Sequence, residues 1–351
     1  MKDNKGFLII NLDCDTLLDE EAEILSNKFI GGVLLFKHNF VNINQIKSLI
    51  DNIKSINNKL LIAIDHEGGR VQRFNEGFSS LPSFNSIGNI YRTNHNLADK
   101  IAYNSGYIAG YELKAIGIDL NFSPVIDLSV KSNVLNSRTF SESSTNVIRL
   151  SLSYIQGLID NGIIPTLKHY PGHGTVSGDT HTDLINCNIP WNDLYKHLVV
   201  FEKIHNKYEV PIMTSHIQFS EISNDPVTTS SKWLKDIPRK VFDKLPCFIS
   251  DDLEMLGIRK HYPELSRLNI LEKTLTSGCS MAIVTTMQDK KIIKEKKSHL
   301  FYKNEYLDKL NSHSINTDHI NLPSLDNLSY NRGEVDTYHK AIKIMGQHIK
   351  E

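Results

Sequence analysis

Short apolar segments recur along the chain, and each is followed by a longer segment whose apolar residues are spaced as on one face of a helix. Several of the short segments, such as LLIAI and MAIVTT, are largely apolar throughout, which is typical of strands buried on both faces of a parallel sheet. Eight such segments are predicted to be strands: 7–12, 32–36, 60–64, 119–122, 164–168, 210–214, 247–250 and 281–285.

The longer segments carry apolar residues at positions i, i+3, i+4 and i+7, and five of them are predicted to be helices: 43–56, 97–116, 147–159, 194–204 and 268–275. Strands that alternate with helices indicate an α/β fold, and eight of them match a (β/α)8 TIM-type barrel. A doubly wound open sheet is the alternative, but no GxGxxG turn follows the first predicted strand.

The length of 351 residues fits one barrel, because barrels of this type extend from about 200 to more than 400 residues. The chemically distinctive motifs lie between about residues 7 and 286, and the chain turns lysine-rich and polar from residue 290. We therefore expect a single domain over residues 1–351, with peripheral helices and loops at about 290–351.

Composition excludes several classes of protein. With 40% apolar and 23% charged residues the chain can bury a large core, so it is neither disordered nor fibrous. The 39 basic and 40 acidic residues give a net charge of −1 without a basic stripe, which argues against nucleic acid or an anionic membrane as a partner. Apolar runs fall far short of the roughly 20 residues that span a bilayer.

The N-terminus and the cysteines indicate the compartment. The opening sequence, MKDNKGFLIINLDCD, places carboxylates where a signal peptide would continue its apolar region, so we expect a cytoplasmic protein. The four cysteines, at positions 14, 187, 247 and 279, have neither disulfide-framework nor CxxC zinc-site spacing. We expect reduced, mostly buried thiols.

Polar groups follow five of the predicted strands, at the ends where a barrel carries its chemistry. Any one of them could be a helix cap or a structural histidine, but together they predict a polar pocket at one end of the barrel. They are DHEGGRVQR from Asp65 to Arg73, SPVID ending at Asp127 with SRTF around Arg138, KHYPGHG from Lys168 followed by DTH from Asp179 to His181, SH at 215–216, and Asp251 with Asp252.

These motifs resemble the successive signatures of bacterial β-N-acetylglucosaminidases of glycoside hydrolase family 3. The matching segments are DHEGGRVQRF, GIDLNFSPVIDL, SRTF, KHYPGHGTVSGDTH, PIMTSHI and ISDDLEM, which span roughly four fifths of the chain. The resemblance implies a retaining exo-glycosidase that removes terminal β-linked N-acetylglucosamine (GlcNAc). The implied substrate is GlcNAc-1,6-anhydro-N-acetylmuramic acid, with or without its peptide, as in peptidoglycan recycling.

The resemblance also implies roles for individual residues. Asp251 is expected to be the nucleophile, with Asp252 as a competitor on sequence alone and otherwise a cap or supporting group. His181 is expected to be the acid/base, with Asp179 as the carboxylate that fixes its tautomer and raises its pKa. Glycines 174 and 178 are expected to let this loop close.

The remaining matches are expected to hold the terminal sugar: Asp65, Arg73, Arg138, Lys168 and His169. Glu67 and Arg70 are interpreted as an ion pair that braces the Gly68-Gly69 turn, and His173 as a group that orients the loop. His66 replaces a common Gln of the family, and Ser280 stands where the family often has Asp.

Three alternatives stay open. Fifteen histidines and several strand-end carboxylates allow a metal-dependent hydrolase, although Lys168 beside the candidate ligands disfavours a cation. A non-catalytic sugar-binding protein is the second. Substrate-assisted cleavage that uses the Asp251-Asp252 pair is the third. We expect no cofactor and no metal, and a monomer whose partner is a small sugar substrate.

Overall fold

The computed structural model describes residues 6–129, 135–285 and 335–348. Nine strands form one sheet in the order β7-β6-β3-β2-β1-β13-β12-β10-β8, and all the paired strands in it are parallel. The strands are β1 (Leu8–Asn11), β2 (Ile30–Leu35), β3 (Leu61–Ile64), β6 (Leu120–Asn121), β7 (Ile164–Pro165), β8 (Leu167–Tyr170), β10 (Ile212–Thr214), β12 (Phe248–Asp252) and β13 (Cys279–Val284).

The sheet closes on itself because β7 and β8 are two parts of one extended segment, interrupted at Thr166. One part pairs with β6 and the other with β10. The Thr166 amide donates to the Ser123 carbonyl at 3.1 Å, so the segment stays bonded across the interruption. Each of the eight predicted strands is found, in chain order around the barrel. The predicted α/β barrel is confirmed, and the alternative of a doubly wound open sheet is wrong.

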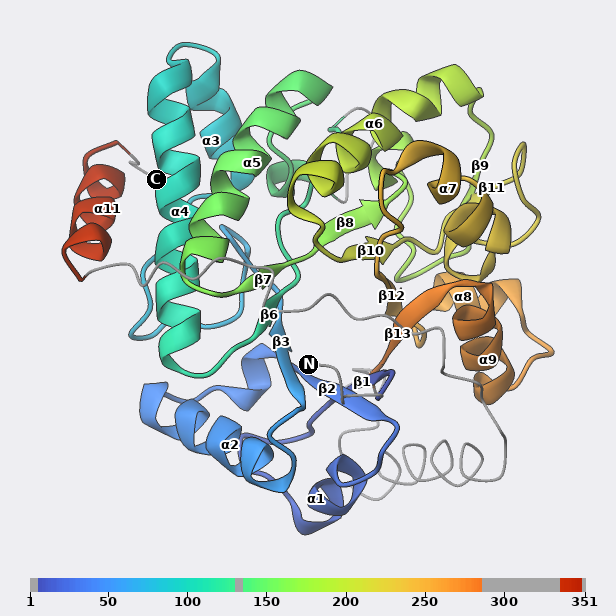
Figure 1. Cartoon of the computed structure of the whole chain (residues 1–351), viewed down its shortest axis with the longest axis horizontal. Coiled ribbons are helices and arrows are strands. Elements are labelled where there is room, and N and C mark those ends of the chain that lie inside the picture. The colour runs from blue at the N-terminus through green and yellow to red at the C-terminus, as the bar shows by residue number, and fades with distance from the viewer. Residues whose placement is uncertain (1–5, 130–134, 286–334, 349–351) are drawn as a thin grey trace.

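Helices surround the strands, as Figure 1 shows. The five predicted helices are present and differ from the prediction by a few residues at their ends. The helices are α1 (Asp19–Leu25), α2 (Ile43–Ile56), α3 (Phe84–Tyr91), α4 (His95–Ala115), α5 (Ser144–Asp160), α6 (Trp191–Tyr208), α7 (Pro238–Val241), α8 (Leu256–His261), α9 (Arg267–Ser277) and α11 (Val335–His348).

Local sequence sets where several helices begin. The side chain of Asn42 accepts a hydrogen bond from the Gln45 amide at the start of α2, and Asn94 and Ser266 do the same for α4 and α9. Such caps satisfy amides that have no partner within the helix and typically contribute about 1 kcal/mol each.

Two apolar clusters explain why the strands are apolar on both faces. Within β1, Ile9 belongs to the cluster inside the barrel, whereas Leu8 and Ile10 belong to the cluster between the barrel and the helices. Successive strand residues point to opposite faces, so a barrel strand needs apolar residues at consecutive positions.

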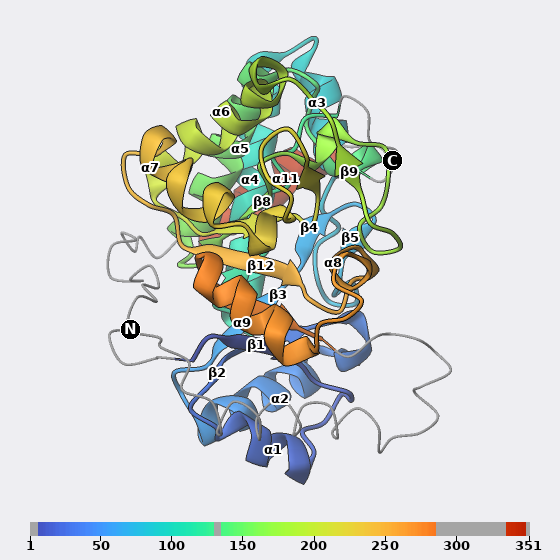
Figure 2. The same ribbon diagram turned by 90° about the vertical axis from the view of Figure 1, so that its right-hand side faces the viewer.

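One end of the barrel carries additional structure. Strands β4 (His66–Gly68) and β5 (Val71–Gln72) form an antiparallel hairpin, and β9 (Asn186–Cys187) pairs with β11 (Gln218–Phe219). In Figure 2 the hairpin, β9 and α8 lie towards the end to which the β12 arrow points. The sequence did not predict these strands, because two or three residues are too few to show a period.

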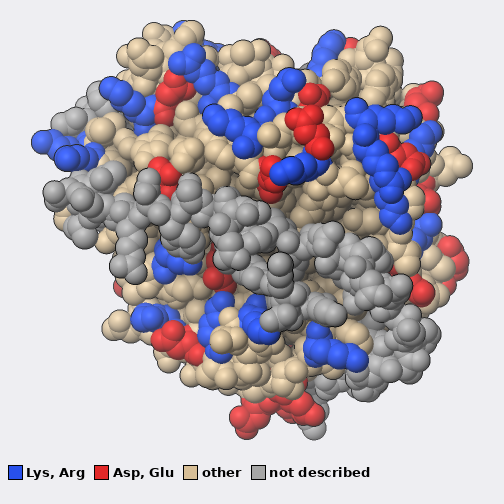
Figure 3. All heavy atoms as spheres, viewed as in Figure 1, with Lys and Arg blue, Asp and Glu red and all other residues tan. Residues whose placement is uncertain are grey.

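Helix α11 lies beside α4 (Figure 1), where Ala341 and Met345 are buried and the Ser105 hydroxyl lies 3.3 Å from the Met345 sulfur. The predicted peripheral segment at 290–334 falls outside the described residues. No disulfide joins the four cysteines, of which all but Cys14 are buried. No helix in the described ranges could cross a membrane. On the face in Figure 3, basic and acidic side chains are interspersed.

Candidate active site

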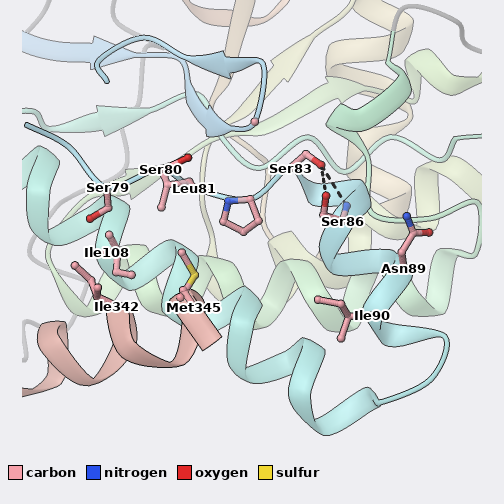
Figure 4. Close-up of a pocket in the computed structure, with 13 residues that line it drawn as sticks. Ser79, Ser80, Leu81, Ser83, Ser86, Asn89, Ile90, Ile108, Ile342 and Met345 are labelled. Carbon is pink, nitrogen blue, oxygen red and sulfur yellow. Dashed lines mark hydrogen bonds between the residues drawn. The ribbon is translucent and has the colours of Figure 1, made fainter. Parts of the chain in front are cut away.

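A cavity of about 760 Å³ lies at the C-terminal ends of the barrel strands, and several ionisable side chains face it. A second cavity of about 910 Å³ lies between α11 and α3 (Figure 4). That second cavity is lined by serines, an asparagine and apolar residues, and its lining holds no titratable side chain. Acid/base chemistry therefore belongs to the first cavity.

All eight site residues expected from the sequence line the first cavity: Asp65, Arg73, Arg138, Lys168, His169, Asp179, His181 and Asp251. They come from the ends of β3, β8 and β12 and from the loops that follow β5, β6 and β8. The structure therefore brings the expected set together in one place.

Lys168 joins two carboxylates at the centre of this set. Its Nζ lies 2.7 Å from Asp65 Oδ1 and 2.7 Å from Glu67 Oε1. Arg73 pairs with the other oxygen of Asp65 at 3.0 Å, and Arg138 donates from Nε and Nη2 to Glu67 at 2.9 and 2.8 Å. Two carboxylates and three cations thus form one continuous network.

The network determines the ionisation of both acids. Burial opposes ionisation of Asp65, but Lys168 and Arg73 outweigh it and hold the pKa of Asp65 well below its usual range. For Glu67, burial is likewise outweighed, by Arg138 and Lys168, and the pKa falls to about 2. Glu67, interpreted from sequence as a partner of Arg70, is thus part of the network that supports the cavity.

Asp127 orients His169. Its Oδ2 accepts from Nδ1 of His169 at 2.8 Å and from the His169 amide at 3.1 Å, and its Oδ1 accepts from the His173 amide at 2.6 Å. Burial opposes ionisation of Asp127, yet contacts with His169 keep its pKa low. The Nδ1–H donor leaves Nε2 of His169 as the ring nitrogen available to a ligand in the cavity.

Asp251 lies on β12 with its carboxylate at the cavity. The Asp252 amide donates to Asp251 Oδ1 at 2.8 Å. Burial opposes ionisation of Asp251, but the imidazoles of His169, His216 and then His181 outweigh it, so its pKa lies below the usual range. Asp251 is therefore an anion at neutral pH, as a nucleophile must be.

Asp252 is held differently. Its carboxylate accepts from the Thr285 amide at 3.0 Å, from the Thr285 hydroxyl and from the Glu254 amide at 3.1 Å. Nε2 of His216 donates to its carbonyl at 2.9 Å. Burial raises the pKa of Asp252 to about 6. These contacts fit the supporting role given to Asp252 and bind β12 to the end of β13.

His181 stands on the loop that follows β8, with its side chain 63% exposed. Its Nδ1 lies 2.8 Å from Asp179 Oδ1, and its amide donates to the same oxygen at 2.9 Å. Burial opposes ionisation of Asp179, and the contacts with His181 keep its pKa low. The pair therefore fixes one tautomer and leaves Nε2 for a substrate.

The same loop docks on the segment after Asp251. The Gly257 amide donates to the Thr180 carbonyl at 2.9 Å, and the Lys260 ammonium lies 2.9 Å from Asp183. His173 reaches the Thr180 hydroxyl at 3.4 Å, which fits the expected orienting role. Gly174 was expected to give freedom, but a Cβ there would lie 1.7 Å from the Leu128 carbonyl oxygen, so it allows close packing instead.

His66 points away from the cavity, among Phe74 and Phe78. It is fully buried, and neither ring nitrogen has a hydrogen-bond partner. Burial, with a smaller contribution from Arg73, lowers its pKa to about 3. His66 is therefore a neutral part of the support behind the β4–β5 hairpin.

Sequence reasoning placed Asp127 and His216 in the predicted polar pocket without giving either a role, and it did not single out Thr285. In the structure Asp127 does not line the cavity but positions His169, which does. Thr285 and His216 act through Asp252 across strands, which only the barrel register reveals. No group of three or more potential metal ligands occurs in the parts of the chain that the structure describes.

Comparison with known proteins gives the family. The model of the glycosyl hydrolase family 3 N-terminal domain matches residues 6–318. A β-hexosaminidase from Psychromonas ingrahamii is 37% identical over 279 residues, which cover 79% of this chain and 81% of that protein.

Solved structures agree over nearly the whole chain. Native NagZ from Neisseria gonorrhoeae superposes with a TM-score of 0.80 at 29% identity, covering 99% of this chain and 98% of that one. NagZ from the same organism in complex with N-trifluoroacetyl-D-glucosamine gives 0.79 at 28%, covering 98% of each chain. The protein with this cavity at the end of its barrel is therefore a β-hexosaminidase of glycoside hydrolase family 3.

Proposed function

We propose that this β-hexosaminidase removes terminal β-linked GlcNAc from peptidoglycan fragments, namely GlcNAc-1,6-anhydro-N-acetylmuramic acid with or without its peptide. The reaction retains configuration and passes through a covalent glycosyl-enzyme. The observation that carries the proposal is that ionised Asp251 and the Asp179–His181 pair face the same cavity. The enzyme acts in the cytoplasm as a monomer.

The sugar is held by the network and by His169. Arg73, Arg138 and Lys168 lie with Asp65 on the cavity wall, where they offer donors and a carboxylate to ring hydroxyls. Because these groups already fix one another, the terminal sugar meets a site that needs little reorganisation.

Cleavage takes two steps. His181 gives its Nε2 proton to the glycosidic oxygen while a carboxylate oxygen of Asp251 bonds to the anomeric carbon, and the bond between that carbon and the glycosidic oxygen breaks. Neutral His181 then takes a proton from water, whose oxygen attacks the same carbon and releases Asp251. The hydrogen bond from Nδ1 of His181 to Asp179 stabilises the imidazolium that donates in the first step and keeps Nε2 directed to the substrate.

Asp252 is the weaker candidate for a nucleophile. Its carboxylate is occupied by Thr285 and by the Glu254 amide, and with a pKa of about 6 it is partly protonated near neutrality. The substrate-assisted route needs a second carboxylate that is directed to the acetamide. The engaged position of Asp252 favours the covalent route.

The test uses 4-nitrophenyl N-acetyl-β-glucosaminide beside 4-nitrophenyl β-glucoside, with and without EDTA. We expect nitrophenol release from the N-acetyl substrate, unaffected by the chelator. Asp251→Ala should abolish turnover and retain sugar binding, whereas Asp236→Asn, an exposed carboxylate paired with Arg239, is the matched control. Loss of activity in EDTA would instead support the metal-dependent hydrolase, and binding without hydrolysis would support the sugar-binding protein.

Two further measurements separate the roles. His181→Ala should lose much more activity on the natural disaccharide than on the aryl glycoside, whose leaving group needs no proton. Incubation with 5-fluoro-β-N-acetylglucosaminyl fluoride should add one sugar mass to the peptide that contains Asp251. Equal losses on both substrates would contradict the acid role, and a label on Asp252 would contradict the nucleophile assignment.

A further inference from the structure

The turn of the β4–β5 hairpin is built with little freedom. Gly68 and Gly69 have φ angles of +103° and +56°, in the region that favours glycine. A Cβ on Gly68 would lie 2.5 Å from the Pro82 carbonyl oxygen, and one on Gly69 would lie 2.7 Å from Ser83 Cβ. The Gly69 amide also donates to the Leu81 carbonyl at 2.9 Å. The backbone of the next residue, Arg70, is therefore held in place.

Figure 4 shows Leu81 and Ser83, two residues of the segment that packs against this turn, where they line the second cavity beside α11. Arg70 lines the first cavity together with Asp251 and His181, and its side chain is exposed. The cavity thus carries a cation at its rim, on a rigid turn.

The cations that line the cavity differ in their exposure to solvent. Lys168 is buried, and Arg73 and Arg138 are half-buried beside Asp65 and Glu67, a part of the lining called the inner wall here. Arg70 is exposed to solvent and lies on the hairpin turn.

The other charges on the lining are mostly negative. Asp179, Asp251, Asp252 and Glu254 face the same space, although Glu254 is paired with Arg267 at 2.9 Å. An anionic group that enters beside these carboxylates is repelled unless a cation lies next to it.

We propose that Arg70 is the specificity-determining residue for the leaving group, where it binds a carboxylate on the sugar that is released. The inference rests on the proposed function and concerns the peptide-free fragment, because its muramic acid residue carries a free carboxylate on the lactyl ether, whereas the peptide of the other form is joined to this carboxyl as an amide. The inference places GlcNAc at the inner wall and the leaving group beside His181, in the part of the cavity that Arg70 also lines. A guanidinium suits this task, since its planar donors match a carboxylate in fork geometry.

The test compares three substrates that share the GlcNAc group: GlcNAc-1,6-anhydro-N-acetylmuramic acid, its lactyl methyl ester and 4-nitrophenyl N-acetyl-β-glucosaminide. Arg70→Ala should lower kcat/KM for the acid by about 10- to 30-fold, the effect of a charge-assisted hydrogen bond. It should change kcat/KM for the ester and the aryl glycoside by less than about threefold. Arg70→Lys should recover part of the loss, because it keeps the charge but not the fork.

Two controls complete the design. Lys47→Ala removes an exposed cation on α2 that pairs with Asp51, and it should leave all three rates unchanged. In the wild-type protein, raising the salt concentration should reduce the ratio of kcat/KM for the acid to kcat/KM for its methyl ester, because salt screens the interaction between exposed charges.

The outcomes distinguish the two proposals. Equal losses on acid, ester and aryl substrates, or no loss on the acid, would overturn the role of Arg70 while the wild-type protein stays active on the disaccharides. A wild-type protein that hydrolyses neither disaccharide would refute the proposed function, and the role of Arg70 would be refuted with it.

Discussion

Glu67 offers the sharpest test of the charge network, because its carboxylate is almost fully buried and forms ion pairs with both Arg138 and Lys168. We predict that Glu67→Gln destabilises the protein by about 3 kcal/mol at pH 7. The pKa of Glu67 falls from 4.5 to about 2 on folding. At about 1.4 kcal/mol per pKa unit this difference corresponds to about 3 kcal/mol, close to the roughly 3–5 kcal/mol lost when one partner of a buried pair is removed.

The sign of the pH dependence follows from the lowered pKa. Ionised Glu67 stabilises the folded state fully above pH 4.5, and this contribution is lost as the pH falls through about 2. The stability difference between wild type and Glu67→Gln should therefore be largest near neutrality and fall to roughly half by pH 3.

The measurement is urea unfolding between pH 3 and 7, followed by the fluorescence of the buried Trp233. Glu209→Gln is the control, because Glu209 pairs with Lys244 on the surface and should lose less than about 1 kcal/mol. A loss at Glu67 no larger than at Glu209, or one that does not shrink with acid, would refute the reasoning.

Two further predictions concern the groups around the cavity. Asp127→Asn must turn an amide donor towards the backbone amide of His169 or His173. The free energy of unfolding in urea should therefore fall by about 1–3 kcal/mol, and kcat/KM should fall by up to about 100-fold; an unchanged kcat/KM would contradict the orienting role. Lys260→Ala removes the contact with Asp183 on the loop that carries His181, and it should lower kcat on the aryl glycoside by roughly 2- to 5-fold without changing KM. Lys260→Arg keeps the charge and should recover the wild-type kcat.

The barrel could be predicted because its strands are buried on both faces. Consecutive apolar residues, as at Leu8, Ile9 and Ile10, are needed where one cluster fills the barrel and another lies under the helices. The β4–β5 hairpin escaped prediction because its strands have two or three residues, and its glycines act through contacts with Pro82 and Ser83 that are remote in sequence.

The members of the candidate site could also be predicted from the sequence, but their ion pairs could not. Strand-end position and motif resemblance were enough to identify eight of the side chains that line the cavity. Their pairing was not predictable, because Glu67 had a plausible partner three residues away and its partners in the structure come from positions 138 and 168. Ion pairs between residues of different strands depend on the register of the strands, which cannot be inferred from the spacing of residues close in sequence.

The order of strands around the barrel has a consequence for synthesis. Strand β1 lies between β2 and β13, so the first strand of the chain keeps one edge open until residues 279–284 have been made. Asp65, His181 and Asp251, like the other residues of the proposed site, all precede that point in the chain. A nascent chain on the ribosome therefore carries every proposed site residue before its barrel can close, and the candidate site assembles only when β13 pairs with β1.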